Sequence, residues 1–99
     1  MKILINELNK AFESRVRLGI MSVLAVNDTL DFNSLKEYLQ VTDGNLASHL
    51  KALEKEEYIA VEKSFIDKKP NTRYSITLLG KKAFNDHLAV LEGLIQSQK

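Results

Sequence analysis

The stretch that decides the fold is TDGNLASHLKALEKE, residues 42–56. Thr42 or Asp43 provides a side-chain oxygen that can cap the first turn of a helix. Leucines then recur with the spacing i, i+4, i+7, which places Leu46, Leu50 and Leu53 on one stripe. The sequence therefore predicts an amphipathic helix over 42–56.

A second face of this helix carries small, uncharged or cationic side chains. At 100° per residue, that face and its edge hold Asn45, Ser48, His49, Lys51, Ala52 and Lys55. Side chains of this kind let a helix enter the major groove of DNA and reach base edges without repelling phosphates. The alternative is an ordinary surface helix with a few Ser and Asn residues.

Length and composition limit the class of protein. The 99 residues, 44% of them hydrophobic, suffice for one domain (1–99) with a modest core. No apolar run approaches the roughly 18–20 residues that a membrane helix needs, and Asn6 and Glu7 end the apolar start too early for a signal peptide. The absence of cysteine excludes disulfides and thiolate metal sites. We therefore expect a cytoplasmic protein. Because the net charge is only +1, any binding of nucleic acid depends on local charge.

Two helices are expected at the N-terminal end. The first spans 2–12, and its apolar face needs a cover, either the chain's own core or a second chain. That face consists of Leu4, Leu8 and Phe12, or of Ile5, Leu8 and Phe12. The second helix runs from Ser14 to about Val26. Two cations near its start, Arg15 and Arg17, oppose the helix dipole, so each is expected to have a partner, either a phosphate or an acidic side chain.

A short helix is expected directly before 42–56. Alternation over 30–32 favours a one-bridge strand, and Asn33 or Ser34 can cap a helix over 35–40. A break of three residues, 41–43, follows. Two helices joined by so short a turn, the second with a groove-compatible face, form a helix-turn-helix arrangement.

After residue 57 the periodicity changes from 3.6 to 2, which predicts strands over 58–65 and 72–78. Pro70 and Asn71 are expected to stop both strands and form a hairpin tip over 66–71. Basic charge collects around this tip, where one acid, Asp67, accompanies the four cations Lys63, Lys68, Lys69 and Arg73. The alternative is a hairpin that lysines keep soluble. Next to a helix-turn-helix, the charge favours contact with a DNA backbone.

Thr77 or Leu79-Gly80 is expected to begin a last helix over 80–97. An apolar seam with the spacing i, i+4, i+7, i+11 runs along it and consists of Phe84, Leu88, Leu91 and Ile95. Because so small a domain needs little further cover, we interpret this helix, together with residues 1–13, as a homodimer interface. The alternative is a long helix that closes the core of the monomer.

Three segments carry a family resemblance. SRVRLGIMSVL (14–24) looks like the segment that opens many bacterial and archaeal winged-helix regulators. FNSLKEYLQVTDGNLASHLKALEKEEYIAVEKSF (32–65) resembles the tract from the first helix of the motif through the recognition helix into the wing, and TRYSITLLGKKAF (72–84) matches the wing's return strand. The chain is thus similar to small MarR/ArsR-like transcriptional regulators. This implies an α+β, mostly α, winged helix-turn-helix fold with a two- to three-stranded wing sheet and terminal dimerisation helices.

The resemblance also implies a homodimeric regulator that binds double-stranded DNA. It implies base contacts from Asn45, Ser48 and His49, backbone contacts from Lys51 or Lys55, and wing contacts from Lys68, Lys69 and Arg73. Ala47 and Ser48 stand where many relatives have Ser and Arg or Lys, so the bidentate contact of an arginine with guanine is missing. Because of this departure, recognition is expected to depend more on DNA shape and phosphate contacts than on direct base contacts.

Other classes of protein fit the sequence less well. A metal-sensing relative would need ligands, but the last helix offers only Asp86 and His87, about 100° apart, with Glu92 too far along. No metal or cofactor is therefore expected, and the sequence names no pocket for an organic effector. A protein-interaction module on this scaffold would carry acidic or apolar residues on the recognition face and the wing, whereas the hairpin here has cations. An enzyme is not expected, because His49 and His87 lie on separate helices without a nucleophile or paired carboxylates.

Overall fold

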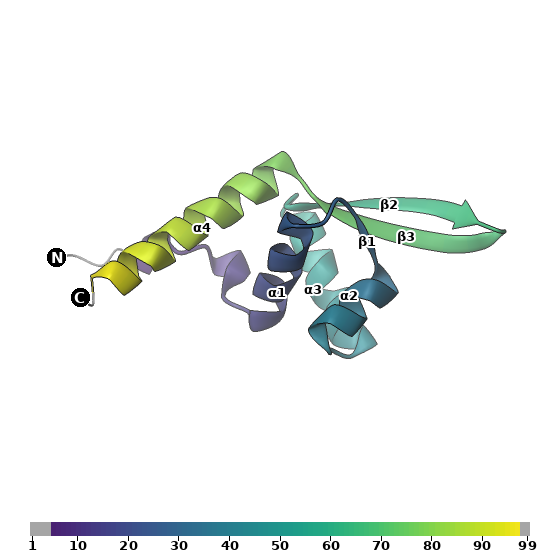
Figure 1. Ribbon diagram of the computed structural model, residues 1–99, viewed down its shortest axis with the longest axis horizontal. Helices are drawn as coiled ribbons and strands as arrows, with labels where there is room; N and C mark the ends of the chain where they lie inside the picture. Colours follow the sequence, from purple (N-terminus) through teal and green to yellow (C-terminus); the bar gives the residue numbers. More distant parts are fainter. Residues whose placement is uncertain (1–4, 98–99) are drawn as a thin grey trace.

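The computed structural model describes residues 5–97. These residues form four α-helices, two short 3-10 helices and a three-stranded antiparallel sheet, which confirms the α+β class (Figure 1). The helices are α1 (Arg15–Ala25), α2 (Phe32–Leu39), α3 (Asp43–Lys55) and α4 (Leu78–Gln96), and the strands are β1 (Leu30–Asp31), β2 (Ile59–Ile66) and β3 (Lys69–Ile76). The sheet order is β1-β3-β2.

Side-chain caps define where the α-helices begin. Ser14, Thr42 and Thr77 each accept a hydrogen bond from the backbone N–H three residues ahead, as expected for N-caps. The cap of α2 is Asp31, whose Oδ1 accepts from the Ser34 N–H at 2.7 Å. The prediction of Asn33 or Ser34 as this cap was wrong, and α2 begins three residues earlier than expected. Hydrogen bonds from Ser34 hold the pKa of Asp31 below its ordinary value, so the cap is charged at neutral pH.

The core lies where α1, α2 and α3 meet the base of the sheet. The leucine stripe of α3 is buried as predicted, with Leu46 and Leu53 fully inaccessible and Leu50 2% exposed. The other buried hydrophobic residues come from every layer of the fold: Phe12, Ile20, Met21, Leu24, Leu35, Ile59 and Phe84. The helix-turn-helix pair α2–α3 is therefore fixed by its apolar face, which leaves the second face of α3 outside.

The β2–β3 hairpin turns more tightly than predicted. Its strands pair up to Ile66 and Lys69, so the turn consists of Asp67 and Lys68 alone, with positive φ angles of 50° and 66°. Two left-handed residues in a two-residue loop are the mark of a type I′ turn, whose twist matches that of the strands. The expected tip over 66–71 was wrong because Pro70 and Asn71 belong to β3.

Pro70 is compatible with β3 because of its place in the ladder. Ile66 and Lys69 flank the turn as a hydrogen-bonded pair, so the next pair, Phe65 and Pro70, is of the non-hydrogen-bonded type. The nitrogen of Pro70 then faces away from β2. Since β1 pairs with β3 only at Arg73 and Tyr74, no ladder bond is lost at Pro70.

The N-terminal segment is not one helix over 2–12. Within the described residues it forms two 3-10 helices, η1 (Ile5–Glu7) and η2 (Lys10–Phe12), separated at Asn9. Asn9 interrupts the segment because its side chain accepts from the Ala11 N–H at 2.9 Å and its own N–H donates to His87 Nδ1 at 3.0 Å. Leu8 is half-buried, and Leu4 lies outside the described residues.

Phe12 and Phe84, both predicted at a dimer interface, instead contribute to the core of the single chain. They are 1% and 5% exposed, and their rings meet edge to face with centroids 5.6 Å apart. The seam of α4 therefore splits into a buried first half and an exposed second half, where Leu88 is 42% and Ile95 is 64% exposed.

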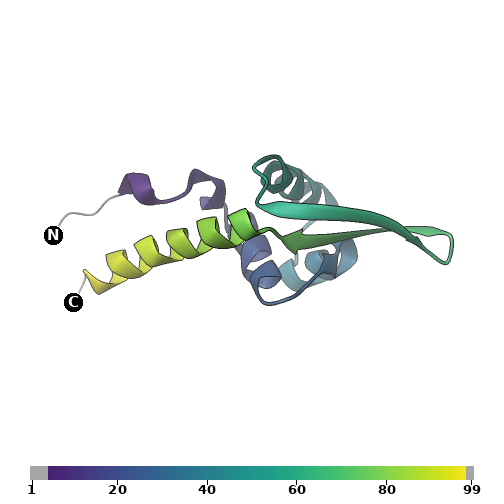
Figure 2. The ribbon, with the colours of Figure 1, turned by 90° about the horizontal axis from the view of Figure 1, so that it is seen from above.

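The molecule is elongated, with extents of 58 × 25 × 21 Å. Both ribbon views show the C-terminal half of α4 leaving the body at one end and the β2–β3 hairpin leaving it at the other (Figures 1 and 2). The helix-turn-helix lies between these two extensions.

Candidate nucleic-acid interface

The outward face of α3 has the side chains that the sequence predicted. Asn45, Ser48, Lys51 and Lys55 are all exposed. The first two turns add two small exposed residues, Gly44 and Ala47. A Cβ built on Gly44 would meet no atom within 4 Å, so packing within the fold does not require glycine there. The first two turns of α3 thus present little bulk to an approaching surface.

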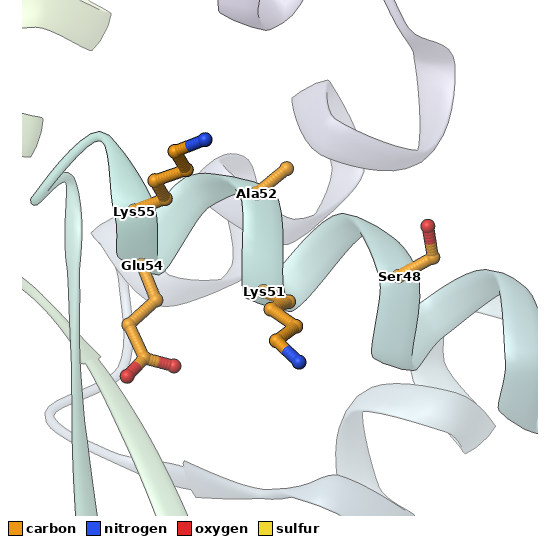
Figure 3. Close-up of a pocket in the computed structure, with 5 residues that line it drawn as sticks. All are labelled: Ser48, Lys51, Ala52, Glu54 and Lys55. Carbon is orange, nitrogen blue, oxygen red and sulfur yellow. The ribbon is translucent and has the colours of Figure 1, made fainter.

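Figure 3 shows how the later turns of α3 are divided. Ser48, Ala52 and Lys55 point to one side of the helix, and Lys51 and Glu54 point to the other; together they line a pocket on its outer surface. Glu54 is an acid that the sequence analysis did not assign to this surface. Burial is the main cause that raises the pKa of Tyr74 on β3, and the negative charge of Glu54 raises it further.

His49 is held differently from its neighbours on α3. It is half-buried, and its Nδ1 accepts a hydrogen bond from Arg17 Nε of α1 at 3.0 Å. The predicted partner for Arg17 was a phosphate or an acid, and the structure instead provides a neutral ring nitrogen. Burial first, and the Arg17 charge second, lower the pKa of His49. The ring is therefore neutral at pH 7 and carries its proton on Nε2, which leaves a hydrogen-bond donor on the far side of the ring.

An ion pair joins the two helices of the helix-turn-helix. Lys36 Nζ on α2 lies 2.7 Å from Asp43 Oδ1 in the first turn of α3. Both side chains are largely exposed, so the pair adds little stability. Its effect is local, because it offsets the negative charge of Asp43 at the end of α3 that a groove would receive. Lys36 was not among the predicted site residues, because nothing in the sequence pattern pairs it with Asp43.

The cations of the hairpin fall into two groups. Lys63, Lys68 and Lys69 are exposed along its outer part. Arg73 is half-buried at the base, where its Nε donates to Thr29 Oγ1 at 2.8 Å and its Nη2 donates to the Thr29 carbonyl at 3.3 Å. The structure therefore separates Arg73 from the three lysines with which it was grouped.

His87, considered above as a metal ligand and as a catalytic residue and rejected as both, lies inside the fold. It is 4% exposed, and its ring meets that of Phe12 edge to face at 5.3 Å. Burial lowers its pKa, while Glu13 acts in the opposite direction. Asp86 points elsewhere and pairs with Lys82 at 2.8 Å. In residues 5–97 no three His, Cys, Asp or Glu side chains come together as a metal-binding group.

The described helices are also too short or too polar to cross a membrane. The exposed polar and cationic side chains described above lie mainly on α3 and on the hairpin.

The family model for the winged helix DNA-binding domain matches residues 16–95 of this chain. The chain belongs to this family. In its terms α3 is the recognition helix and the β2–β3 hairpin is the wing.

Relatives of this winged-helix chain support the assignment. An uncharacterized protein of Methanocaldococcus jannaschii is 40% identical over 79 residues, which cover 80% of this chain and 86% of that protein. The solved structure of a transcriptional regulator homologue from Pyrococcus horikoshii OT3 is 29% identical, with a TM-score of 0.80 over 96% of this chain and 99% of that one. The resemblance to winged-helix transcriptional regulators is confirmed.

The same fold occurs in a protein whose structure was solved with DNA. Bacillus subtilis PadR, in complex with operator DNA, matches 76% of this chain and 48% of its own chain, with a TM-score of 0.68 and 19% identity. At this identity the likeness establishes the fold only.

Proposed function

We propose that this protein is a cytoplasmic, homodimeric transcriptional regulator that binds specific double-stranded DNA sites. The recognition helix enters the major groove, and the wing contacts the backbone or the minor groove beside it. The observation that carries the proposal is the outward face of α3, where small side chains and two lysines are free and the one early acid, Asp43, is offset by Lys36. PadR, a protein of the same fold, has been solved on operator DNA.

Base readout in this proposal comes mainly from Asn45 and Ser48. Asn is suited to a bidentate contact with adenine, and Ser can bond to several base edges. His49 contributes through its Nε2–H, with Arg17 as the group that holds the ring. Lys51 and Lys55 bind phosphates of the major groove, and Lys68 and Lys69 bind phosphates beneath the wing. Arg73, bonded to Thr29, orients the base of the wing.

The exposed half of α4 supports the proposed dimer. Leu88 and Ile95 are exposed, Leu91 is half-buried, and the N-terminal segment that contains Leu4 and Leu8 completes the proposed interface. One winged-helix module makes few phosphate contacts and should bind weakly. Two modules held together would engage half-sites about one helical turn apart, about 34–36 Å.

The test is binding to a pool of random-sequence duplexes as a function of salt. Because each neutralised phosphate releases counterions, log affinity should fall linearly with log salt. The Lys68→Ala/Lys69→Ala variant should show a slope shallower by about 1.8, equivalent to two lost phosphate contacts. Lys81→Ala/Lys82→Ala is the matched control, since it removes the same charge from exposed positions on α4.

A control variant that flattened the slope equally would reduce the effect to net charge and contradict the assignment of the wing. A folded protein that bound no duplex at low salt would overturn the DNA-binding proposal itself. The outward face of α3 should then be tested against protein partners.

A further inference from the structure

Large apolar side chains are exposed to solvent at the wing tip, which consists of residues 65–70. Phe65 is 76% exposed and Ile66 is 56% exposed, and Pro70 opposite Phe65 is exposed as well. Beyond Arg73 the hairpin has two strands only, and both ribbon views show it extending past the helices (Figures 1 and 2). Neither side chain belongs to the core, and such exposed strands are prone to aggregate.

The pairing sorts the wing tip into two faces. Side chains alternate along a strand, so Phe65 shares its face with Lys63, and across the ladder with Pro70. Ile66 and Lys69 share the opposite face. Because Phe65 and Pro70 oppose each other as a non-hydrogen-bonded pair, their side chains are as close as cross-strand neighbours become. One face of the wing tip is therefore an apolar edge with a lysine behind it.

The turn places another cation at the extreme end. Asp67 and Lys68 both have left-handed φ angles, although type I′ turns favour Asn-Gly or Asp-Gly because side chains are strained there. Lys68 occupies the position where glycine would be least strained. The turn thus carries a charged side chain at a conformational cost, and it is no wider than two residues.

We propose, on the basis of the proposed function, that the wing tip enters the minor groove and that Phe65 inserts between two base pairs, kinking the duplex. Charge decides the partner, since residues 63–70 hold three lysines, Lys63, Lys68 and Lys69, and one acid, Asp67. The minor groove combines a strongly negative potential with stacked bases on which an aromatic ring can lie. Apolar wedges of this kind unstack a base step and bend DNA in other minor-groove proteins.

The first experiment selects duplexes from a random pool with the wild type and with Phe65→Ala in parallel. Pyrimidine–purine steps such as TA unstack most easily, so the wild-type pool should be enriched in such a step at a fixed distance from each half-site. The Phe65→Ala pool should keep the half-site and lose the step. Ile66→Ala is the matched control, because it removes an exposed apolar side chain from the other face of the wing tip.

The second experiment measures bending of one wild-type-selected duplex of about 30 base pairs by energy transfer between its labelled ends. The wild type and Ile66→Ala should shorten the end-to-end distance. Phe65→Ala should leave the duplex straighter and bind about tenfold more weakly, with an unchanged salt slope, since no charge is lost. Its thermal unfolding should match the wild type, because Phe65 lies outside the core.

Three outcomes would contradict this inference, and they distinguish a failure of the insertion from a failure of the proposed function. A Phe65→Ala protein that selects the same step and bends DNA as the wild type does would refute the insertion and leave the proposed function intact. Equal losses in Phe65→Ala and Ile66→Ala would also refute it, because a general apolar contact does not distinguish the two faces. Failure of the wild type to enrich any duplex would overturn the proposed function as well.

Discussion

The wing and the C-terminal half of α4 both extend from the body of the molecule, at opposite ends, and they expose different chemistry. The wing carries three exposed lysines and an apolar tip. From residue 87 to residue 96 the sequence of α4 has a single charged side chain, Glu92, and its exposed surface includes Leu88 and Ile95. A cationic extension suits a polyanion, whereas a nearly uncharged apolar one suits another apolar surface. The two ends are therefore suited to two different partners.

The two extensions meet where α4 leaves the sheet. Gly80, in the first turn of α4, lies against the backbone of Tyr58 just before β2, and a Cβ on it would stand 2.0 Å from the Tyr58 carbonyl oxygen. The same oxygen accepts from the Thr77 N–H at 3.1 Å. This contact determines how closely the helix approaches the hairpin, and only glycine permits it.

The largest effect is therefore expected from Gly80→Ala. The obstacle is backbone and not a flexible side chain, so α4 must move away from β2 or the Thr77 bond must break. We expect a loss of about 3 kcal/mol or more in the free energy of unfolding, and a Tm lower by about 12 °C or more. Chemical and thermal denaturation would measure both. A variant as stable as the wild type would show that the junction is looser than the structure describes.

The next effect concerns the apolar extension alone. Leu88→Asp/Ile95→Asp should convert the proposed dimer to a monomer, with the dissociation constant raised by at least about 100-fold, because an unpaired charge would be buried in the interface. Light scattering over a concentration series measures the mass. Leu78→Asp is the control, since Leu78 is a leucine of the same helix, 89% exposed and outside the seam. The double variant should still fold, because both side chains are exposed in the single chain.

A dimer of unchanged mass in the Leu88→Asp/Ile95→Asp variant would exclude the exposed half of α4 as the interface. Loss of the dimer without loss of the salt slope for DNA would show that each wing contacts phosphates independently and that α4 only couples the two modules.

Much of this arrangement could be predicted from the sequence, where a local pattern was sufficient. The leucine stripe of α3 and the cap Ser14 depend on residues close in the chain, and both were predicted. Thr42 and Thr77 were each one of two predicted starts, and both are the caps in the structure. The family assignment likewise rested on contiguous motifs, and it holds.

The errors arose where a distant residue competes with the local pattern. Residues 2–12 have helical spacing, but Asn9 bonds to His87 from 78 residues away and breaks the segment. Arg17 was expected to pair with a phosphate or an acid, but its Nε donates to His49 Nδ1, 32 residues along the chain. Pro70 has the usual composition of a tip, but the position of the turn depends on the register of the whole hairpin. None of these contacts produces a repeating pattern of residues that could be recognised in a single sequence.

The third expected effect is on the pH dependence of stability, and it concerns how α4 is attached to the body. The pKa of His87 is lowered in the folded protein from an ordinary value of 6.5, mainly by burial, with Glu13 opposing. The unfolded chain therefore binds a proton more readily, so the stabilisation by neutral His87 is complete above pH 6.5 and is lost as the pH falls below it. Because protonation also removes the Nδ1 acceptor of the Asn9 N–H, the N-terminal segment should loosen from α4 at the same time.

Urea unfolding of the wild type and His87→Gln between pH 7.5 and pH 5 tests this expectation, and the variant should show a weaker pH dependence. His49→Gln is the comparison, because the pKa of His49 is also lowered and its loss should remove a separate part of the slope. If His87→Gln kept the full wild-type slope, the acid sensitivity would not come from the attachment of α4.

The smallest expected effect comes from Gly93 and concerns which side of α4 faces a second chain. At 100° per residue, Gly93 lies opposite the seam formed by Leu88, Leu91 and Ile95, and a Cβ there would meet no atom within 4 Å. Alanine in place of a mid-helix glycine should stabilise the fold by about 0.5–1 kcal/mol, because less backbone freedom is lost on folding. The mass and the dissociation constant of the dimer should stay as in the wild type. A dimer weakened by this single methyl group would mean that the partner packs closely on the glycine side, and the seam would then have to be assigned to the opposite face of α4.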